Sequence, residues 1–292
     1  MNKTLACSVI LYFPRSDVLD NIATYIQDVD FLYVVDNGGG KHVSEALYEK
    51  YTNKIEIIRH ETNQGIAKSL NEVLQRCNGK FDLLMTMDQD SSFANNAMYR
   101  YRNGLENIDW EETFGVAPEI TLKDKGKTGN NICTQDVPLR WSPVARCITS
   151  GNIISVSKAL SIKGFDESLF IDEVDHEICF RASLHGWKHF RTAGVTLWHC
   201  LGCTVEKRIL GFTVHIMGHP KIRKYYIARN RLIVWNKYHK FDEKFFFRMY
   251  IIGLIWEFSC ICFFESDKIG KIRFFLKGVR DAFKNKTGKM NK

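Results

Sequence analysis

The sequence predicts an α/β fold, in which a mostly parallel sheet is flanked by helices and a C-terminal helical extension follows. Short apolar stretches alternate with stretches of helical spacing near the amino terminus, as parallel sheets require. Polar side chains directly follow two of the apolar stretches, where ligands bind in such sheets. From Lys221 onward, apolar and basic residues recur with helical spacing.

The elements of the sheet region are expected in a regular order. Strands are predicted at the continuous apolar stretches 5–13, 31–35, 55–59 and 81–87. Helices are predicted at 18–26, 43–51 and 66–77, where apolar residues recur every three or four positions. The Asn63-Gln64-Gly65 sequence opens the last of these helices.

The middle of the chain is less regular. Residues 109–138 are polar and rich in glycine and lysine, which favours a loop with an edge strand. A strand-like stretch at 146–156 surrounds Ser150 and Gly151, a helix is expected from about Glu173 to His185, and a short strand at 196–199. A change of composition near 213–220 predicts two domains, 1–215 and a helical segment at 216–292.

Composition and charge limit the functional classes. Of 292 residues, 45% are hydrophobic and 25% charged, which is typical of a folded protein with a sizeable core. The net charge is +8, and the excess lies between Lys221 and Lys292, so phosphate-bearing partners are expected. The chain lacks a helix-turn-helix, a zinc finger or an RNA-binding aromatic motif, so we expect no nucleic-acid partner.

Cysteine usage and hydropathy indicate a cytoplasmic protein. Nine cysteines, an odd number, are scattered through apolar stretches, as in proteins of reducing compartments. The amino terminus lacks the pattern of a signal peptide. The longest apolar stretch, 249–264, is interrupted by Glu257, so we expect no membrane-spanning segment.

Two aspartates end the fourth predicted strand in the sequence MTMDQDSSF. Asp88 and Asp90 are two residues apart, so in an extended chain their side chains point to the same side. Such a pair repels itself unless a positive charge lies beside it, and Mg²⁺ or Mn²⁺ can bridge it to a diphosphate. The same residues also favour a simple turn, and the spacing alone leaves both interpretations open.

A second acidic cluster, Asp172 to Glu177, precedes an apolar helix face. Asp172 could cap that helix, and acids in a first helical turn suit its dipole. This interpretation accounts less well for Asp175 and Glu177, either of which could serve as a general base.

His199 and Arg229 are the remaining candidates for a polar site. His199 precedes Cys200 and Cys203, but no second pair of ligands is present to complete a zinc site, so core cysteines are expected. Arg229 could hold a diphosphate or belong to a solvated basic surface. No glycine-rich loop of the nucleotide-binding types occurs in the chain.

These motifs together resemble one enzyme family. In order, they are VVDNG at 34–38, NQGIA at 63–67, MDQDS at 87–91, TSG at 149–151, GFDESLFID at 164–172, VDHE at 174–177, WH at 198–199 and YYIARN at 225–230. Their combination and order resemble the inverting family-two glycosyltransferases of GT-A fold, and most closely the bacterial rhamnosyltransferase branch. The likeness extends over about residues 5–235.

The resemblance implies a role for each matching residue. Asp175 stands at the position of the catalytic base, Asp90 and His199 at the metal, and Asp88 near the ribose and diphosphate. Donor-binding positions are Asp36, which would contact the nucleotide base, and Asn37, Gly65, Ser150, Gly151, Glu177 and Arg229. In one departure from the wider family, Val174 replaces the glutamate that commonly precedes the base.

The resemblance also implies an activity. It is a metal-dependent, inverting transfer of rhamnose from dTDP-rhamnose, with Mg²⁺ or Mn²⁺, onto a bacterial surface polysaccharide such as O-antigen or onto a lipid-linked acceptor. The alternatives are another donor, namely UDP-galactofuranose, UDP-glucose or UDP-N-acetylhexosamine, and a non-catalytic subunit that binds nucleotide sugars.

The C-terminal segment has two interpretations. Aromatic residues are frequent at 245–264 and lysines at 268–292, the pattern of a helix lying in a membrane interface. This pattern predicts peripheral contact with the cytoplasmic face of the inner membrane. The alternative is a capping or dimerising element, which would make the protein a homodimer.

Overall fold

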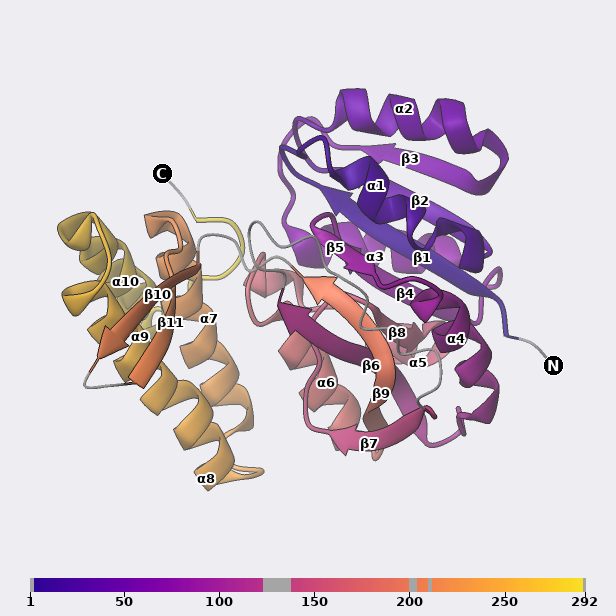
Figure 1. Cartoon of the computed structure of the whole chain (residues 1–292). Helices are drawn as coiled ribbons and strands as arrows, with labels where there is room; N and C mark the ends of the chain where they lie inside the picture. Colours follow the sequence, from indigo (N-terminus) through magenta and orange to yellow (C-terminus); the bar gives the residue numbers. More distant parts are fainter. Residues whose placement is uncertain (1–2, 123–137, 200–203, 210–211, 291–292) are drawn as a thin grey trace. The chain divides into compact units, whose positions relative to one another are not determined.

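The computed structural model describes residues 3–122, 138–199, 204–209 and 212–290. It divides into two compact units (Figure 1). The first, the sheet unit, comprises Met1–Asp166 and Asp175–Cys200, and the second, the helical unit, comprises Glu167–Val174 and Leu201–Lys292. The domain boundary expected near residue 215 stays a prediction.

A nine-stranded mixed sheet forms the centre of the sheet unit. Its order is β3-β2-β1-β4-β8-β6-β9-β5, with β7 also paired to β9. The strands are β1 Leu5–Leu11, β2 Phe31–Asp36, β3 Ile55–Arg59, β4 Leu83–Asp88, β5 Ser91–Phe93, β6 Thr113–Leu122, β7 Arg140–Val144, β8 Asn152–Ser155 and β9 Lys188–His199. Strands β3, β2, β1 and β4 are parallel, so Asp36 and Asp88 both lie at carboxyl ends of this sheet.

Helices cover both faces of the parallel strands. They are α1 Val18–Ala23, α2 Lys41–Tyr51, α3 Ile66–Cys77, α4 Ala97–Gly104, α5 Val156–Ser161 and α6 Val174–Leu184. Alternate residues of β1, from Leu5 to Leu11, pack in one core with apolar residues of α1, α2 and α4. Helix α3 packs against β1 and β4 and against α5. The predicted alternation of strands and helices in this region is therefore confirmed.

The structure corrects the expectations for the middle of the chain. Strand β6 pairs with both β8 and β9. It is therefore an interior strand of the sheet and not the edge strand that was expected within residues 109–138. Residues 123–137 of that region lie outside the described residues. Strand β9 has twelve residues where only four were expected, because it pairs with β5, β6 and β7, which are distant in sequence.

Helices form most of the second unit, as expected, and a two-stranded hairpin accompanies them. The helices are α7 Lys221–Tyr238, α8 Glu243–Phe246, a π-helical turn Phe247–Ile252, α9 Gly253–Phe263 and α10 Lys268–Phe283. The hairpin pairs β10 Thr204–Ile209 with β11 Phe212–Met217 and was not predicted. Ala228, Leu254, Ile261 and Phe275 form a small core of α7, α9 and α10.

Four charged side chains, three of them buried and one partly buried, hold the same helices together. Lys224 of α7 donates from Nζ to Glu257 of α9 and, at 2.6 Å, to Glu265. Lys271 of α10 donates to the other oxygen of Glu265 at 2.7 Å. These four residues, the buried ion cluster, balance two positive against two negative charges, and both lysine side chains are at most 8% exposed.

One described helical stretch differs from the expectation that the chain has no segment able to span a membrane. Residues Glu243–Phe263 form 21 continuous helical residues. The most apolar 18-residue window of this stretch has a mean hydropathy of 1.6, and 28% of that window is buried. By length and composition alone such a helix could cross a membrane.

Candidate active site

Gln89 lies between Asp88 and Asp90 at the end of β4, and its own side chain is held in place. Its side-chain Oε1 accepts a hydrogen bond from the Tyr12 N–H at 2.9 Å, and its Nε2 donates to the Tyr12 carbonyl at 3.0 Å. The side chain between the aspartates is therefore bound to the chain that follows β1. The Asn21 amide also donates to the Gln89 carbonyl at 3.0 Å.

Asp88, Asp90 and His199 form the acid cluster. One ligand atom from each residue lies within 4.8 Å of the other two. The hydroxyl of Ser150 donates to Asp88 Oδ2 and accepts from Ser91 Oγ at 2.9 Å. Ser91 Oγ also lies 2.7 Å from Nδ1 of His199, which is 3.6 Å from Asp90 Oδ1. Strands β4, β5 and β9 thus bring these predicted residues together.

The acid cluster holds more negative than positive charge. Partial burial raises the pKa of Asp90 above its ordinary value, the neighbouring Asp88 raises it further, and His199 offsets part of the effect. Two carboxylates and one imidazole are suitable ligands for a divalent cation such as Mg²⁺ or Mn²⁺. A bound cation would relieve the repulsion that the structure shows, so the residues fit the predicted metal.

A tight turn presents Ser150 to the acid cluster. Thr86 of β4 donates from Oγ1 to the Thr149 carbonyl at 2.6 Å, and its own carbonyl accepts from Gly151 N–H at 2.8 Å. Gly151 has φ +74°, and a Cβ atom there would lie 2.7 Å from the ring of Pro118. Only glycine fits this position, which explains Gly151 without a ligand.

The same turn holds Asp175, the predicted base. Its Oδ2 accepts from the Thr149 N–H at 3.1 Å and from Thr149 Oγ1 at 3.5 Å, and its Oδ1 accepts from the His176 N–H at 2.9 Å. Asp175 lies in the first turn of α6 and is partly exposed. Two adjacent residues, Thr149 and Ser150, therefore contact Asp175 and Asp88 respectively.

Asp36, Asn37 and Gly65 shape the turns beyond β2 and before α3. Asp36 Oδ1 accepts from the Gly38 and Gly40 N–H groups at 3.1 and 2.9 Å. Asn37 is buried, and its Oδ1 accepts from Gln64 N–H at 2.8 Å. Gly65 has φ +84° where α3 begins. All three lie at the carboxyl edge of the sheet, and their predicted contacts with a donor stay predictions.

Glu177 is a buried partner of Arg181. The two side chains form an ion pair of 2.7 Å, and the same guanidinium donates to the Gly164 carbonyl at 2.7 Å. Arg181 also donates to the Ile162 carbonyl. These contacts join α6 to the loop after α5, and the predicted role of Glu177 in donor binding stays untested.

Arg229 belongs to the helical unit, where it is completely buried. Its guanidinium donates to the carbonyls of Gly288 at 2.6 Å and Leu169 at 3.0 Å, and it lies over the ring of Tyr226 at 5.0 Å. These contacts account for the arginine within its own unit. The expected contact with a diphosphate stays a prediction.

The loop Glu167–Val174, which leads into Asp175, has an unusual backbone. Phe170, Asp172 and Glu173 all have φ between 63° and 66°, the left-handed region that non-glycine residues rarely adopt. Asn230 of α7 donates to three carbonyls of this loop, those of Leu169, Ile171 and Asp172, at 2.6–3.0 Å.

Asp172 does not cap α6 as the sequence suggested. Helix α6 begins at Val174, and Asp172 Oδ1 accepts from Arg223 at 3.0 Å. Burial raises the pKa of Asp172, and Arg223 partly offsets this increase. Its Oδ2 has no hydrogen-bond partner among the described residues. The loop is therefore held by α7 rather than by helix capping.

Sequence reasoning gave no separate role to Gln89, Ser91 or Thr149. Each lies within one of the motifs described above. That position is the signal by which these residues could have been assigned to the site. Their bonding partners Tyr12, His199 and Asp175 are distant in sequence and could not be identified from it. Cys200 and Cys203 lie outside the described residues.

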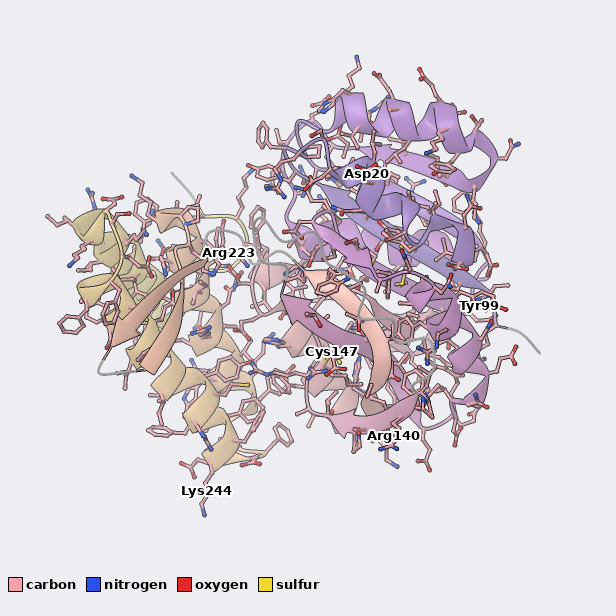
Figure 2. All side chains as sticks on the ribbon, viewed as in Figure 1. Asp20, Tyr99, Arg140, Cys147, Arg223 and Lys244 are labelled. Carbon is pink, nitrogen blue, oxygen red and sulfur yellow. The ribbon has the colours of Figure 1, made fainter. Side chains whose placement is uncertain are left out.

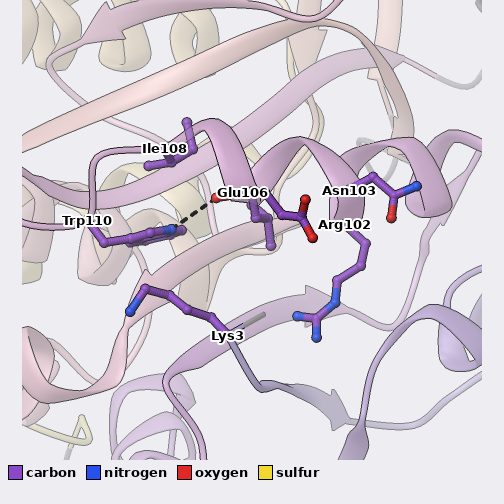
Figure 3. Close-up of a pocket in the computed structure, with 7 residues that line it drawn as sticks. Lys3, Arg102, Asn103, Glu106, Ile108 and Trp110 are labelled. Atoms are coloured by element: carbon purple, nitrogen blue, oxygen red, sulfur yellow. Dashed lines mark hydrogen bonds between the residues drawn. The ribbon is translucent and has the colours of Figure 1, made fainter. Parts of the chain in front are cut away.

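The hollow drawn in Figure 3 is remote from this chemistry. It has a volume of about 170 Å³ and includes Lys3, Arg102, Glu106 and Trp110 in its lining. Lys3 precedes β1, so the hollow lies toward the amino ends of the parallel strands, whereas the acid cluster lies at their carboxyl ends.

Part of the chain is similar to a known protein family, and most of it is similar to a protein of known name. The family description "Glycosyl transferase family 2" matches residues 17–143. A dTDP-rhamnosyl transferase RfbF of Shigella flexneri is 24% identical over 252 residues, which are 82% of each chain.

Two solved structures show the same fold at low identity. TarS 1–349 of S. aureus, in complex with UDP-GlcNAc, has a TM-score of 0.57 and 14% identity, over 94% of this chain and 81% of that one. GalNAc-T7 with UDP, GalNAc and Mn²⁺ has a TM-score of 0.54 and 12% identity, over 79% of this chain. The match spans about half, 51%, of the GalNAc-T7 chain. The fold is therefore GT-A-like, and residues 17–143 of the chain are similar to glycosyltransferase family 2.

Proposed function

We propose that the protein transfers rhamnose from dTDP-rhamnose to a hydroxyl of a bacterial surface polysaccharide, such as O-antigen, or of a lipid-linked precursor, with inversion. One observation carries the proposal: the Thr149-Ser150 turn contacts both the acid cluster and Asp175. A cation ligand set and a carboxylate able to act as a base are thus held by adjacent residues.

Different residues of this chain would bind the donor and activate the acceptor. Asp90 and His199 would hold Mg²⁺ or Mn²⁺, with Asp88 beside the ribose and diphosphate. When bound, the cation supplies positive charge that stabilises the departing nucleoside diphosphate. Asp36, Asn37, Gly65 and the 150–151 turn would line the donor site at the carboxyl edge of the sheet.

Asp175 would accept the proton of the acceptor hydroxyl. The oxygen attacks the anomeric carbon as the bond from that carbon to the diphosphate oxygen breaks, and the electron pair leaves with the nucleotide. A single displacement of this kind inverts the anomeric centre. The N–H groups of Thr149 and His176 each bind one carboxylate oxygen of Asp175, which fixes its direction.

The choice of rhamnose as the transferred sugar is supported by one similar protein and not by the geometry of the site. The Shigella flexneri protein is named a dTDP-rhamnosyl transferase, and its match extends over 82% of this chain. TarS was solved with UDP-GlcNAc and GalNAc-T7 with UDP and GalNAc. A UDP-sugar donor is therefore the alternative to test directly.

We further propose that the reaction takes place in the cytoplasm. The six cysteines recorded among the described residues are free thiols, and five of them are buried. This usage is typical of proteins in reducing compartments.

A donor panel tests the proposed function. Nucleotide release from dTDP-rhamnose, UDP-galactofuranose, UDP-glucose and UDP-GlcNAc is measured with a polysaccharide extract as acceptor, with and without Mn²⁺. We expect metal-dependent release from dTDP-rhamnose. Preference for a UDP-sugar would reject rhamnose but keep transfer, and nucleotide-sugar binding without turnover would indicate a binding subunit.

Replacement of the base separates binding from chemistry. In Asp175→Asn, we expect donor binding by calorimetry to stay within about twofold of wild type, while transfer falls by about 10³-fold or more. Asp20→Asn, an exposed aspartate of α1 labelled in Figure 2, is the matched control and should retain full turnover. Near-normal transfer by Asp175→Asn would show that another residue is the base.

A further inference from the structure

The long helix of the second unit is apolar on its exposed side as well as on its packed side. Ile252, Ile255, Trp256 and Phe263 are spaced to lie on one face, and their exposed fractions range from 49% to 71%. We call these four residues the outer stripe. On the packed side, Leu254 and Ile261 contact the core of α7 and α10. Contiguous exposed apolar surface of this kind marks an interaction site.

Basic residues extend the outer stripe at its amino end. Lys244 and Arg248 are exposed and precede Ile252 at intervals of four residues, so they lie on the same face of the helix. Lys244 extends from the end of α8 in Figure 2. The apolar stripe therefore continues into a positively charged surface.

The carboxyl-terminal part of this unit has a net charge of the same sign. Residues 221–292 contain 18 basic and 6 acidic residues. Three of the six acids point inward: Glu257 and Glu265 belong to the buried ion cluster, and Asp281 accepts from Tyr225 at 3.2 Å. Half of the acidic side chains of residues 221–292 are therefore buried or partly buried, which leaves the surface of this segment strongly basic.

The packed side of the helix opposes insertion across a bilayer. Glu257 lies near the middle of Gly253–Phe263, and its carboxylate is paired with Lys224, whose side chain is fully buried. A spanning helix would have to break this pair and carry Glu257 into hydrocarbon, which is unfavourable. A helix that keeps its packed side on α7 can expose only the outer stripe to lipid.

We propose that the outer stripe docks on an anionic lipid surface, with the helix lying in the headgroup region. Aromatic and aliphatic side chains enter the interface while Lys244 and Arg248 contact lipid phosphates. Apolar area and basic charge on one face match the chemistry of an anionic leaflet better than that of a second copy of this basic unit, which would repel it. This proposal does not depend on the identity of the donor.

Vesicle flotation of the full chain tests the proposal. We expect wild type to float with vesicles that contain phosphatidylglycerol, to float poorly with phosphatidylcholine alone, and to bind less at high salt. Ile255→Ser with Trp256→Ser should lower the bound fraction by about tenfold, because apolar insertion is lost. Lys244→Gln with Arg248→Gln should weaken binding at low salt only.

A matched control removes apolar area elsewhere. Tyr48→Ser with Tyr99→Ser replaces two exposed aromatic residues of the sheet unit and should float as wild type does. Circular dichroism and thermal melting should show that all three double variants fold. Donor turnover in solution, measured without vesicles, should be unchanged by the Ile255/Trp256 pair, which separates this proposal from the proposed function.

Three results would overturn the proposal. One is failure of folded wild type to bind anionic vesicles. Another is resistance of bound protein to alkaline carbonate extraction, which would indicate a spanning helix. The third is a dimer by light scattering that becomes a monomer in the Ile255/Trp256 variant without any vesicle binding, which would assign the outer stripe to self-association.

Discussion

The two units of the molecule differ in how far the charges of their clustered ionisable side chains are compensated. In the helical unit, Lys224, Lys271 and Glu265 are buried and Glu257 is partly buried. The charges balance, and each carboxylate is in contact with an ammonium. In the sheet unit, Asp88 and Asp90 are partly exposed and share a single histidine.

This contrast separates a structural cluster from a functional one. A buried group of charges with internal balance needs no further partner and joins the helices that carry it. In the acid cluster, burial raises the pKa of Asp90 and the neighbouring Asp88 raises it further, while His199 offsets only part of the effect. A bound cation would offset the remaining negative charge. An ionisable group with a perturbed pKa and incomplete compensation of its charge is typical of a functional site.

The largest expected effect comes from breaking the balanced cluster. Glu265→Gln leaves Lys224 and Lys271 with one carboxylate between them, and we expect a loss of about 3–5 kcal/mol in the free energy of unfolding. Urea titration followed by circular dichroism measures it. Glu243→Gln, an exposed acid of the same unit, should change stability by less than about 0.5 kcal/mol. Equal effects of the two variants would mean that the cluster is not structural.

The next largest effect on stability is expected when Mn²⁺ binds to the acid cluster and offsets its negative charge. At a Mn²⁺ concentration about 100 times the dissociation constant, a specific site stabilises the folded state by about 2.7 kcal/mol. We expect Mn²⁺ to raise the melting temperature of wild type, and the increase to be absent in Asp90→Asn. An equal increase in both proteins would place the cation elsewhere.

An intermediate effect is expected at Asn230, which belongs to neither cluster. Asn230→Ala frees three carbonyls of the loop before Asp175, so we expect a loss of about 1–3 kcal/mol in stability and a lower kcat with little change in KM. Asn236→Ala, an exposed residue on the same helix, is the control. A change in KM alone would argue against a role in holding the loop.

The smallest effect, and the one of opposite sign, is expected for the acid cluster itself. Asp90→Asn removes one of two repelling carboxylates, so without metal we expect stability to stay equal or rise by up to about 1 kcal/mol, because the pair is partly solvated. Transfer should nevertheless be lost. A clear decrease in metal-free stability, measured by urea titration, would mean that Asp90 is structural.

The sequence allowed good prediction where local pattern controls structure. Strands β1 to β4 and helix α3 lie within about two residues of the predicted limits, because each has continuous apolar character or a strong helical period. Strands β6 and β9 were missed or shortened, since their stability comes from partners distant in sequence. The β10–β11 hairpin was also missed, although its two strands are adjacent in sequence.

The candidate site shows the same division. Asp88 and Asp90 were singled out from their position after a strand, and the structure brings His199 to them through the β5–β9 pairing. No local pattern could place Thr149 against Asp175, because that contact joins a turn to a helix 26 residues away.

The amino-acid pattern was enough to predict the alternation of strands and helices from β1 to β4, the acidic residues after β4 and before α6, and the basic charge of the last 72 residues. These properties depend on neighbouring residues, so they can be recognised without a fold. Which charges are balanced follows from the packed fold instead. Lys224 meets Glu257 and Glu265 after the helices pack, whereas Asp88 and Asp90 keep excess negative charge after the sheet forms. The balance of a charged group depends on distances between side chains far apart in sequence, and packing alone sets those distances.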